Sequence, residues 1–365
     1  MFIIICSSTV VQAQQSWQLL DSKYRFSDGL AIARLSDRAD GATGSYEYID
    51  RSGNTAIPGP FEQAEPFNEG FAVVGIDGWH WLINTDGERM FLGGFEKMGP
   101  VSQMRAWFKD EDRTGFISPD GRIVIPAQYQ RAGSFNEGLA PVQRGGVWGY
   151  IDLNGREVIP PQFYLAGDFR NGIAIVRSLK RGTEVPEGGD ILTSTVYPTD
   201  TIKHCIDRQG NLIDLPSIPG GVFVDIAEGR IRVSVVDGAE TSTIFFDIYG
   251  TRLFMSRAGN ASMFSEGVSI LSNARDVSVM EWDGNIRDRI DCLVARPFSE
   301  GRAATAIQNE AGGSLVWGFV DTSGVNVIPH DYQMVTDFHE GRAYVVTRDG
   351  IEQYIDTSGD VIWSE

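Results

Sequence analysis

Short runs of apolar residues, separated by turn residues, recur from one end of the chain to the other. The stretch Phe135–Pro160 shows the pattern most completely. It contains run A (Gly138–Val142), run B (Trp148–Asp152) and run C (Val158–Pro160). Short β-branched and aromatic runs bounded by Gly, Asn and Asp are typical of strands joined by tight turns. The pattern therefore predicts a three-stranded β-meander over this stretch.

The same pattern returns as an internal repeat. Each repeat opens on the Phe of Phe-x-Glu-Gly, here called the mark, and from Phe67 to Phe169 successive marks are 34 residues apart. Nine marks cover the chain: Phe26, Phe67, Val101, Phe135, Phe169, Ile226, Phe264, Phe298 and Phe338. Self-similarity at a period of roughly 20–50 residues indicates a repeat architecture.

An Asp-x-x-Gly sequence separates run B from run C. Its complete form occurs six times: Asp50…Gly53, Asp152…Gly155, Asp207…Gly210, Asp247…Gly250, Asp321…Gly324 and Asp356…Gly359. A short polar acceptor with Gly three residues later favours a type I turn with a left-handed glycine. The two residues before the turn are mostly apolar, as in Tyr150-Ile151. Run B is therefore expected to be covered on both faces, like a central strand.

These features predict an all-β protein of about nine three-stranded β-meander repeats, stacked as a superhelical solenoid. A closed propeller-like ring is the alternative, because the chain starts with a partial repeat at Trp17–Leu20 and ends within run C at Val361–Trp363. Nine repeats exceed the usual number of propeller blades, about four to eight, and three strands are one fewer than a normal blade contains. Both points favour the solenoid. Residues 14–365 are expected to form a single repeat domain.

Several spaced positions resemble a known family. Trp148-Gly149-Tyr150-Ile151-Asp152 and Trp317-Gly318-Phe319-Val320-Asp321 each follow a Glu-Gly-x-Ala segment and precede Val-Ile-Pro. In this they resemble the WG-repeat family of bacterial proteins, over about Phe26–Ile362. The Trp-Gly pair itself is kept only twice. The resemblance implies tandem β-rich repeats that act as interaction modules, and it supplies no catalytic residues.

Length variation between repeats is concentrated in the loop that joins run A to run B. The distance from mark to turn is 17 residues in four repeats, but 24, 38, 21 and 23 in the first, fifth, sixth and eighth. Insertions at equivalent loops often mark a binding face, although loops also tolerate drift in length at small entropic cost. The largest insertion, about Arg177–Lys203, supplies the candidate partner-binding residues. These are Lys180, Arg181, Glu184, Glu187, Asp190 and Tyr197.

Charge and the N-terminal segment limit the partners and the location. The chain has 49 acidic and 31 basic residues, and a net charge of −18 repels phosphate backbones, so no nucleic acid partner is expected. Residues 1–13 are largely apolar and end at Val11-Gln12-Ala13, which indicates a signal peptide that lacks a basic n-region. The expected location is therefore periplasmic or extracellular. No segment is long enough for integral membrane insertion.

No motif for catalysis, a cofactor or a metal emerges from the sequence. Nucleophile-elbow, P-loop and dinucleotide fingerprints are missing, and the histidines lack zinc-ligand spacing. The recurrent Glu of the mark motif is expected to be a turn residue or, alternatively, part of a carboxylate row that favours a cation or a basic partner. Cys205 and Cys292 are expected to be small core residues, with a disulfide between them as the alternative.

The sequence therefore predicts a secreted, non-catalytic scaffold for protein–protein interaction through the edge formed by the loops between runs A and B. The alternative is an extracellular glycan-binding or glycan-cleaving protein. Two carboxylates suffice for glycoside hydrolysis, and exposed indole rings would stack on sugars. The tryptophans considered for that role are Trp79, Trp81, Trp107 and Trp282.

Overall fold

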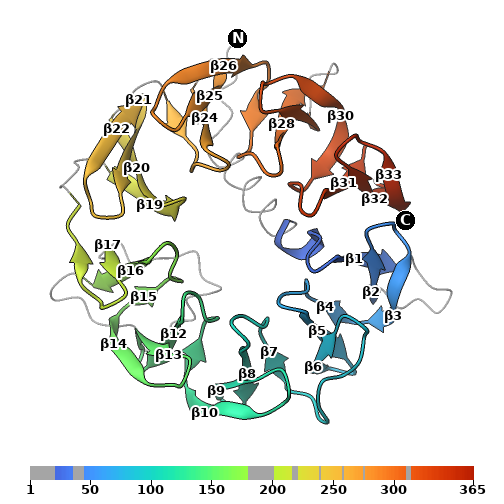
Figure 1. Cartoon of the computed structure of the whole chain (residues 1–365), viewed down its shortest axis with the longest axis vertical. Helices are drawn as coiled ribbons and strands as arrows, with labels where there is room; N and C mark the ends of the chain where they lie inside the picture. The colour runs from blue at the N-terminus through green and yellow to red at the C-terminus, as the bar shows by residue number, and fades with distance from the viewer. Residues whose placement is uncertain are drawn as a thin grey trace. The chain divides into compact units, whose positions relative to one another are not determined.

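The chain folds as a series of small antiparallel sheets (Figure 1). The computed structural model describes residues 21–35, 45–179, 201–215, 221–237, 240–256, 259–273, 276–309 and 314–365. These residues form 33 strands and one helical turn at residues 21–24. The all-β prediction is therefore confirmed. No helix in these ranges is long and apolar enough to cross a membrane.

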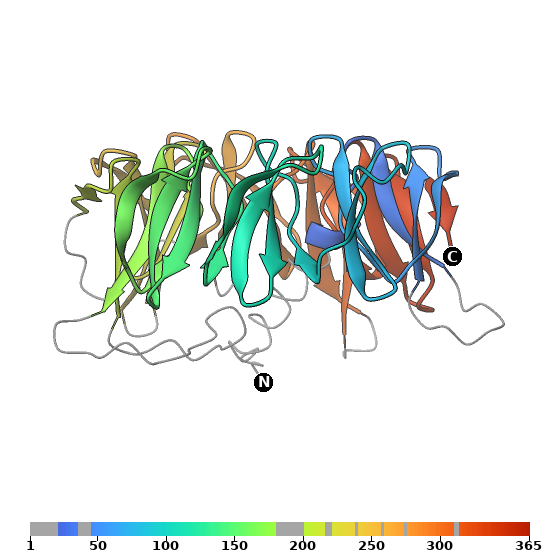
Figure 2. The same ribbon diagram turned by 90° about the horizontal axis from the view of Figure 1, so that it is seen from below.

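Each sheet contains strands that follow one another along the chain, and Figure 2 shows them from the side, with turns at both ends of the strands. The first four sheets comprise β1 (Leu30–Leu35), β2 (Ser45–Asp50) and β3 (Thr55–Phe61); β4 (Gln63–Ala64), β5 (Phe71–Ile76) and β6 (Trp79–Asn84); β7 (Lys97–Met98), β8 (Ala106–Asp110), β9 (Arg113–Ile117) and β10 (Ile123–Tyr129); and β11 (Arg131–Ala132), β12 (Leu139–Arg144), β13 (Val147–Asp152) and β14 (Glu157–Phe163).

The remaining sheets follow the same order along the chain. They comprise β15 (Leu165–Ala166), β16 (Ile173–Leu179), β17 (Thr201–Asp207) and β18 (Leu212–Ile213); β19 (Gly221–Ala227), β20 (Arg230–Asp237), β21 (Glu240–Asp247) and β22 (Arg252–Ser256); β23 (Asn260–Ala261), β24 (Val268–Ser272), β25 (Val277–Glu281) and β26 (Ile286–Ile290); and β27 (Val294–Ala295), β28 (Arg302–Gln308), β29 (Leu315–Asp321), β30 (Asn326–Val335), β31 (Arg342–Thr347), β32 (Glu352–Asp356) and β33 (Val361–Ser364).

A complete sheet has four strands, where the sequence predicted three. The added strand precedes the mark and pairs with run A, as β11 does through Arg131↔Gln143 and Ala132↔Val142. Most of these added strands are only two residues long, so they leave no alternating pattern in the sequence. In the last sheet the single strand β30 pairs with both β29 and β31, and this joins the eighth and ninth repeats into seven strands.

The fourth repeat shows how the predicted motif folds. Tyr150 and Ile151 of β13 are both buried, as expected for a strand covered on both faces. At the turn that follows, Asp152 Oδ1 accepts hydrogen bonds from the backbone N–H groups of Asn154 and Arg156, each at 2.9 Å. Gly155 has φ 79°, in the left-handed region that favours glycine. The predicted turn and the central position of run B are both confirmed in this repeat.

Neighbouring sheets contact each other through aromatic residues and through the turn glycine. Tyr150 of β13 donates a 2.7 Å hydrogen bond to the carbonyl oxygen of Gly167, which lies in the next repeat. Its ring meets the mark Phe169 at 4.8 Å between centroids. Gly155 packs against Ile125 of the preceding sheet, so closely that an added Cβ would lie 3.2 Å from it. These three contacts fix the position of one sheet on the next.

The described strands group into two compact units. Unit 1 comprises Met1–Asp77, Ile83–Glu88 and Phe264–Glu365, and unit 2 comprises Gly78–Leu82 and Arg89–Met263. Unit 1 thus contains strands from both ends of the described chain. The single repeat domain expected from residue 14 onward stays a prediction.

Within unit 1 the first sheet packs against the last strands of the chain. Tyr354 of β32 donates hydrogen bonds to the carbonyl oxygens of Tyr24 (2.9 Å) and Ile32 (2.7 Å). Its ring meets the first mark, Phe26, at 5.3 Å between centroids. The turn glycine Gly53 packs against Ile362 and its neighbour in β33.

These contacts correspond one to one to those between consecutive repeats. Tyr354 bonds the residue two before Phe26, as Tyr150 bonds the residue two before Phe169. An open stack whose ends stand apart does not lead to such contacts, and the predicted solenoid is therefore not confirmed.

Replacing Tyr354 with Phe tests whether the ends meet in solution. Because a buried carbonyl oxygen would lose its donor, we expect the free energy of unfolding to fall by about 1–2 kcal/mol. Urea unfolding followed by tryptophan fluorescence measures the change, and Tyr150→Phe is the matched control within the chain. A loss in Tyr150→Phe together with an unchanged Tyr354→Phe would contradict the contact.

Candidate functional site

The candidate partner-binding residues of the largest insertion lie outside the described residues. They are Lys180, Arg181, Glu184, Glu187, Asp190 and Tyr197. The insertion is shorter in the structure than the sequence predicted. Arg177 pairs with Lys203 and Leu179 with Thr201, so the predicted ends of the insertion belong to strands β16 and β17.

Runs A and B of each expanded repeat form a hairpin, here called an A–B hairpin. In the first, fifth and eighth repeats, strand pairing continues to the base of the insertion: Leu35↔Ser45, Leu179↔Thr201 and Gln308↔Leu315. The sixth repeat differs from the prediction, because its last pair is Asp237↔Glu240 and its extra residues lengthen strands β20 and β21 rather than the loop. The unexpanded fourth repeat pairs equivalently at Arg144↔Val147. The insertions therefore leave the sheets intact, as the sequence predicted when it placed them between runs A and B.

The recurrent Glu of the mark motif contacts the next repeat. Glu137 has φ 50°, and its Oε2 accepts a 2.8 Å hydrogen bond from the backbone N–H of Gly172. Glu300 accepts hydrogen bonds from the N–H groups of Glu340 (2.7 Å) and Gly341 (2.6 Å). Equivalent bonds run from the N–H of Gly70 to Asp28, of Gly138 to Gln103, of Gly301 to Glu266, and of Gly29 to Glu340.

These carboxylates therefore accept hydrogen bonds from the backbone of the next repeat, and they do not form a row of ligands for a cation. Because Gln103 makes the same bond with a neutral amide oxygen, the position needs an acceptor more than a charge. The turn interpretation is confirmed and extended, since the side chain caps the turn of the following repeat. Among the described residues, no group of three His, Cys, Asp or Glu residues is arranged to hold a metal ion.

The tryptophans considered for glycan binding differ in exposure. Trp79 and Trp282 are 48% and 43% exposed. Trp81 is half-buried beneath the guanidinium of Arg89, 4.2 Å from its ring centroid, and Trp107 packs closely against Gly99. Two of the four rings are therefore already covered by the protein.

The two cysteines do not form a disulfide. Cys205 is buried, and burial raises the pKa of its thiol to about 11. Cys292 is half-buried, and burial raises its thiol pKa to about 12. Both thiols therefore remain protonated at neutral pH, which matches the expectation of small core residues.

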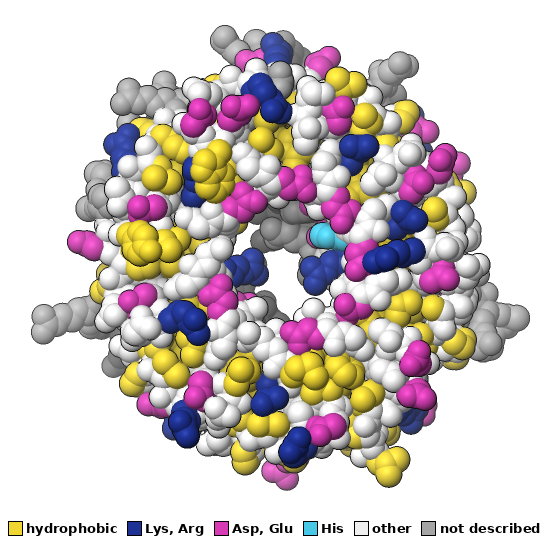
Figure 3. Space-filling view, in the orientation of Figure 1, with side chains coloured by type: hydrophobic (Ala, Val, Ile, Leu, Met, Phe, Trp, Pro, Cys, Tyr) yellow, Lys and Arg dark blue, Asp and Glu magenta, His cyan; other side chains and the backbone are white. Residues whose placement is uncertain are grey.

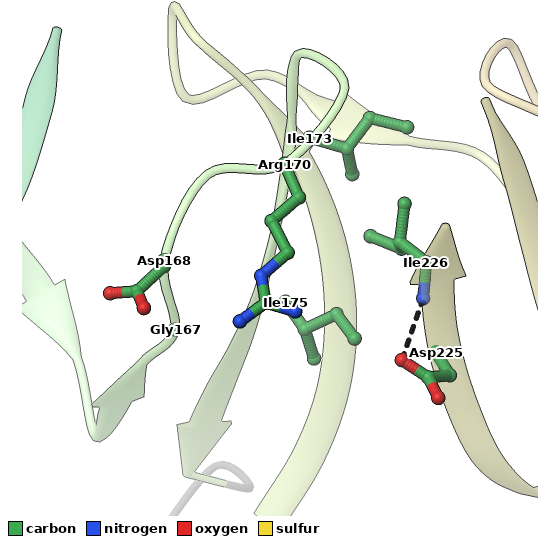
Figure 4. Close-up of a pocket in the computed structure, with 7 residues that line it drawn as sticks. All are labelled: Gly167, Asp168, Arg170, Ile173, Ile175, Asp225 and Ile226. Atoms are coloured by element: carbon green, nitrogen blue, oxygen red, sulfur yellow. Dashed lines mark hydrogen bonds between the residues drawn. The ribbon is translucent and has the colours of Figure 1, made fainter. Parts of the chain in front are cut away.

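A pocket of about 190 Å³ opens between the fifth and sixth repeats, within unit 2 (Figure 4). The segment that leads into β16 contributes Gly167, Asp168 and Arg170, and β16 itself contributes Ile173 and Ile175. Strand β19 supplies Asp225 and Ile226. In Figure 4 the Arg170 guanidinium lies between the two aspartates.

Charges around this pocket are partly desolvated. Burial raises the pKa of Asp168, and the nearby Arg170 opposes that rise. Asp225 accepts a 2.9 Å hydrogen bond from the Ile226 N–H and lies 3.8 Å from Arg232. Burial lowers the pKa of Arg232, with Asp225 opposing. The sequence did not single out these residues, and the only signal is that the two aspartates directly precede marks.

A second cluster of charges lies in unit 1, where the chain ends meet. Asp21 Oδ1 accepts a 3.0 Å hydrogen bond from the Asp337 N–H and lies 3.1 Å from His339 Nε2. The Asp337 carboxylate is 3.7 Å from Arg296 Nη1, and the Arg296 guanidinium lies 4.3 Å from the ring centroid of Trp317. The cluster holds the segment before β1 to the ninth repeat.

Burial shifts the protonation of this cluster. It raises the pKa of Asp337 to about 7, with Arg296 opposing and Asp21 reinforcing the rise. It lowers the pKa of Arg296 to about 10, with Asp337 opposing. For His339, burial lowers the pKa, but the hydrogen bond and charge of Asp21 outweigh it, and the pKa is raised.

Four segments of the chain match the model of the WG containing repeat: residues 48–78, 115–148, 148–178 and 317–349. These segments are WG repeats. Residues 148–178 begin in β13 of one sheet and end in β16 of the next, so a WG repeat joins two neighbouring sheets covalently. No curated protein matches the chain in sequence.

Two crystal structures share the fold. A eukaryotic initiation factor matches with a TM-score of 0.58 at 9% identity, over 93% of this chain and 96% of that chain. Dipeptidyl peptidase 4 of Porphyromonas gingivalis matches with a TM-score of 0.53 at 10% identity, over 82% of this chain and 59% of that one. At such identities the likeness concerns the fold alone.

The face shown in Figure 3 carries acidic, basic and apolar side chains interspersed with one another. Three sites stand out in the described chain: the A–B hairpin tips, the unit 2 pocket and the charged cluster of unit 1.

Asp337→Asn is expected to reduce the dependence of stability on pH. The folded-state pKa of Asp337 lies above the unfolded value of 3.8, so the protonated carboxyl favours folding at low pH and this contribution is lost as pH rises toward about 7. His339, also raised, loses its contribution in the same direction as pH rises through its folded pKa. Urea midpoints at about pH 5 and about pH 8 should therefore differ less in Asp337→Asn than in the wild type.

The exposed Asp112→Asn provides the control for loss of one carboxylate, and it should keep the wild-type pH dependence. An unchanged difference between the two pH values in Asp337→Asn would rule out Asp337 as a source of that dependence.

Proposed function

We propose that this chain is a secreted, non-catalytic repeat scaffold that binds a protein partner through its A–B hairpin tips. One observation carries the proposal: the insertions of the first, fifth and eighth repeats lie at the same structural place, each on a strand pair that remains in register to its last residues. Rigid sheets that present variable loops are a common design for recognition surfaces. The WG repeats and the likeness in fold both fit an interaction scaffold.

We further propose that the repeats close on themselves rather than form an open superhelix. The support is in unit 1, where the last repeat contacts the first through the same tyrosine, mark and glycine contacts that join consecutive repeats. Four-stranded sheets also remove one of the objections to a propeller-like arrangement.

The secreted location is proposed from sequence, since the signal-like residues 1–13 lie outside the described residues. The net charge of −18 suits a partner with a basic surface and opposes binding of nucleic acid. Absence of catalysis is proposed because the sequence carries none of the common catalytic motifs.

Glycan binding is the second candidate, and the exposure of Trp79 and Trp282 favours it. The candidate is weaker than the scaffold, because Trp81 and Trp107 are half-buried in contacts with Arg89 and Gly99. Binding to a glycan array that is lost in a Trp79→Ala, Trp282→Ala double variant would favour it over the scaffold.

Replacing residues 179–201 with Gly-Gly, the tip found at Gly145-Gly146, tests the scaffold directly, because the tip then closes on Ser178↔Ile202, the pair equivalent to Arg144↔Val147. The shortened hairpin reproduces the fourth repeat, so we expect the thermal midpoint to change little while partner capture weakens by about tenfold or more. Capture is measured by immobilising each variant, applying periplasmic and secreted proteins, and quantifying the proteins that are retained.

A Gly/Ser segment of the original length is the matched control, because it keeps the loop and removes its side chains. It should lose capture as the shortened variant does. Full capture by both variants, with both folded, would exclude this hairpin tip as the binding element.

A further inference from the structure

The pocket of unit 2 lies at a junction between repeats that lacks its pair of aromatic rings. At five other junctions, the aromatic residue two before the turn packs on the next mark, with centroids 4.8–5.3 Å apart. The pairs are Tyr48–Phe67, Phe116–Phe135, Tyr150–Phe169, Phe319–Phe338 and Tyr354–Phe26. At the junction of the fifth and sixth repeats, Cys205 and Ile226 occupy these two places within one apolar cluster.

Loss of ring volume is not fully compensated there. The degenerate mark Val101 is accompanied by Phe108, where other repeats have a smaller residue such as Val142, and Phe108 packs on Phe95 at 4.6 Å. Beside Ile226, the residue Ile231 replaces the alanine found in most repeats. A space of about 190 Å³ nevertheless remains against Ile226.

The lining of this space combines an apolar wall with one arginine and two aspartates, Asp168 and Asp225. Ile173, Ile175 and Ile226 supply the wall. Arg170 is exposed at one side, and Asp225 faces it from the neighbouring sheet (Figure 4). A guanidinium binds a carboxylate with two parallel hydrogen bonds, whereas an aspartate accepts hydrogen bonds from an ammonium or amide N–H.

We propose that the pocket binds an aliphatic α-carboxylate with a neighbouring N–H donor, as found in a free aliphatic amino acid or at the C-terminus of a peptide. The carboxylate pairs with Arg170, the N–H group donates to Asp225, and the aliphatic side chain packs against the isoleucines. The volume limits the ligand to one residue, since drug-sized ligands need about 300 Å³ or more.

This site is separate from the A–B hairpin tips. Ile173 begins β16 and Leu179 ends it, so the pocket and the largest insertion lie at opposite ends of one strand, roughly 20 Å apart at about 3.3 Å per residue. The inference therefore does not depend on the proposed scaffold function.

Calorimetric titration of the full chain tests the site with three probes. L-Leucine represents the free amino acid, Gly-Gly-Leu the peptide terminus, and Gly-Gly-Leu-amide lacks the carboxylate. We expect saturable binding of at least one of the first two, and binding of the amide weaker by about tenfold or more. Whichever of L-leucine and Gly-Gly-Leu binds with the higher affinity shows whether the ligand is a free amino acid or a peptide C-terminus.

Two kinds of variant connect binding to the pocket. Ile175→Phe fills the space from a half-buried position, and Ile226→Phe combined with Ile231→Ala restores the residues of the other repeats. Both should abolish saturation while the thermal midpoint shows that the chain is folded. Arg170→Gln should weaken binding by about tenfold or more, whereas Arg113→Gln, an exposed arginine of the same unit outside the pocket, should not.

The inference is overturned if neither carboxylate saturates the wild type or if the amide binds equally well. It is also overturned if a folded pocket-filling variant keeps the wild-type affinity. Because the residues 180–200 are intact in all these variants, partner capture at the hairpin tip is read independently.

Discussion

Backbone N–H groups at the tight turns of six repeats are satisfied by a side chain of the neighbouring repeat. Glu137 accepts the N–H of Gly172, and the Tyr150 phenol donates to the carbonyl of Gly167. A buried backbone group without a partner costs about as much as a lost hydrogen bond, so each repeat depends on its neighbour for its own turns. A terminal repeat would be left with such groups unpaired. In unit 1 the last repeat supplies the missing partners of the first, through Glu340 and Tyr354.

This dependence explains where the chain varies. The mark, the tyrosine and the turn glycine sit in contacts between sheets, where a change of volume or of acceptor is felt by two repeats at once. The insertions of the fifth and eighth repeats follow strand pairs that stay in register to the base of the loop, so length can change there without disturbing the ladders. At the junction with Cys205 and Ile226 the two aromatic residues are replaced by smaller ones, and a pocket lies there.

Much of the local structure was predictable from sequence. The Asp152 turn and the doubly covered strand around Tyr150 follow from residue type and alternation alone. The fourth strand was missed because two residues such as Arg131–Ala132 carry no period.

The role of Glu300 was underestimated because its partners, Glu340 and Gly341, lie about one repeat further along the chain. The contact of Tyr354 with Tyr24 depends on how small rotations between sheets accumulate, which no single repeat encodes. The pocket could have been suspected from two degenerate positions, but the charges of Arg170 and Asp225 around it come from places that vary freely between repeats.

The central claim is that the last repeat caps the first as any repeat caps the next. Residue-resolved hydrogen exchange of the Gly29 amide, which donates to Glu340, tests it most directly, with the Gly172 amide as the internal reference. The account predicts that Gly29 is protected to a similar degree as Gly172, and that Glu340→Ala removes the protection at Gly29 and leaves Gly172 unchanged. Exchange of Gly29 at the rate of an unprotected amide in the wild type, with Gly172 protected, would contradict it.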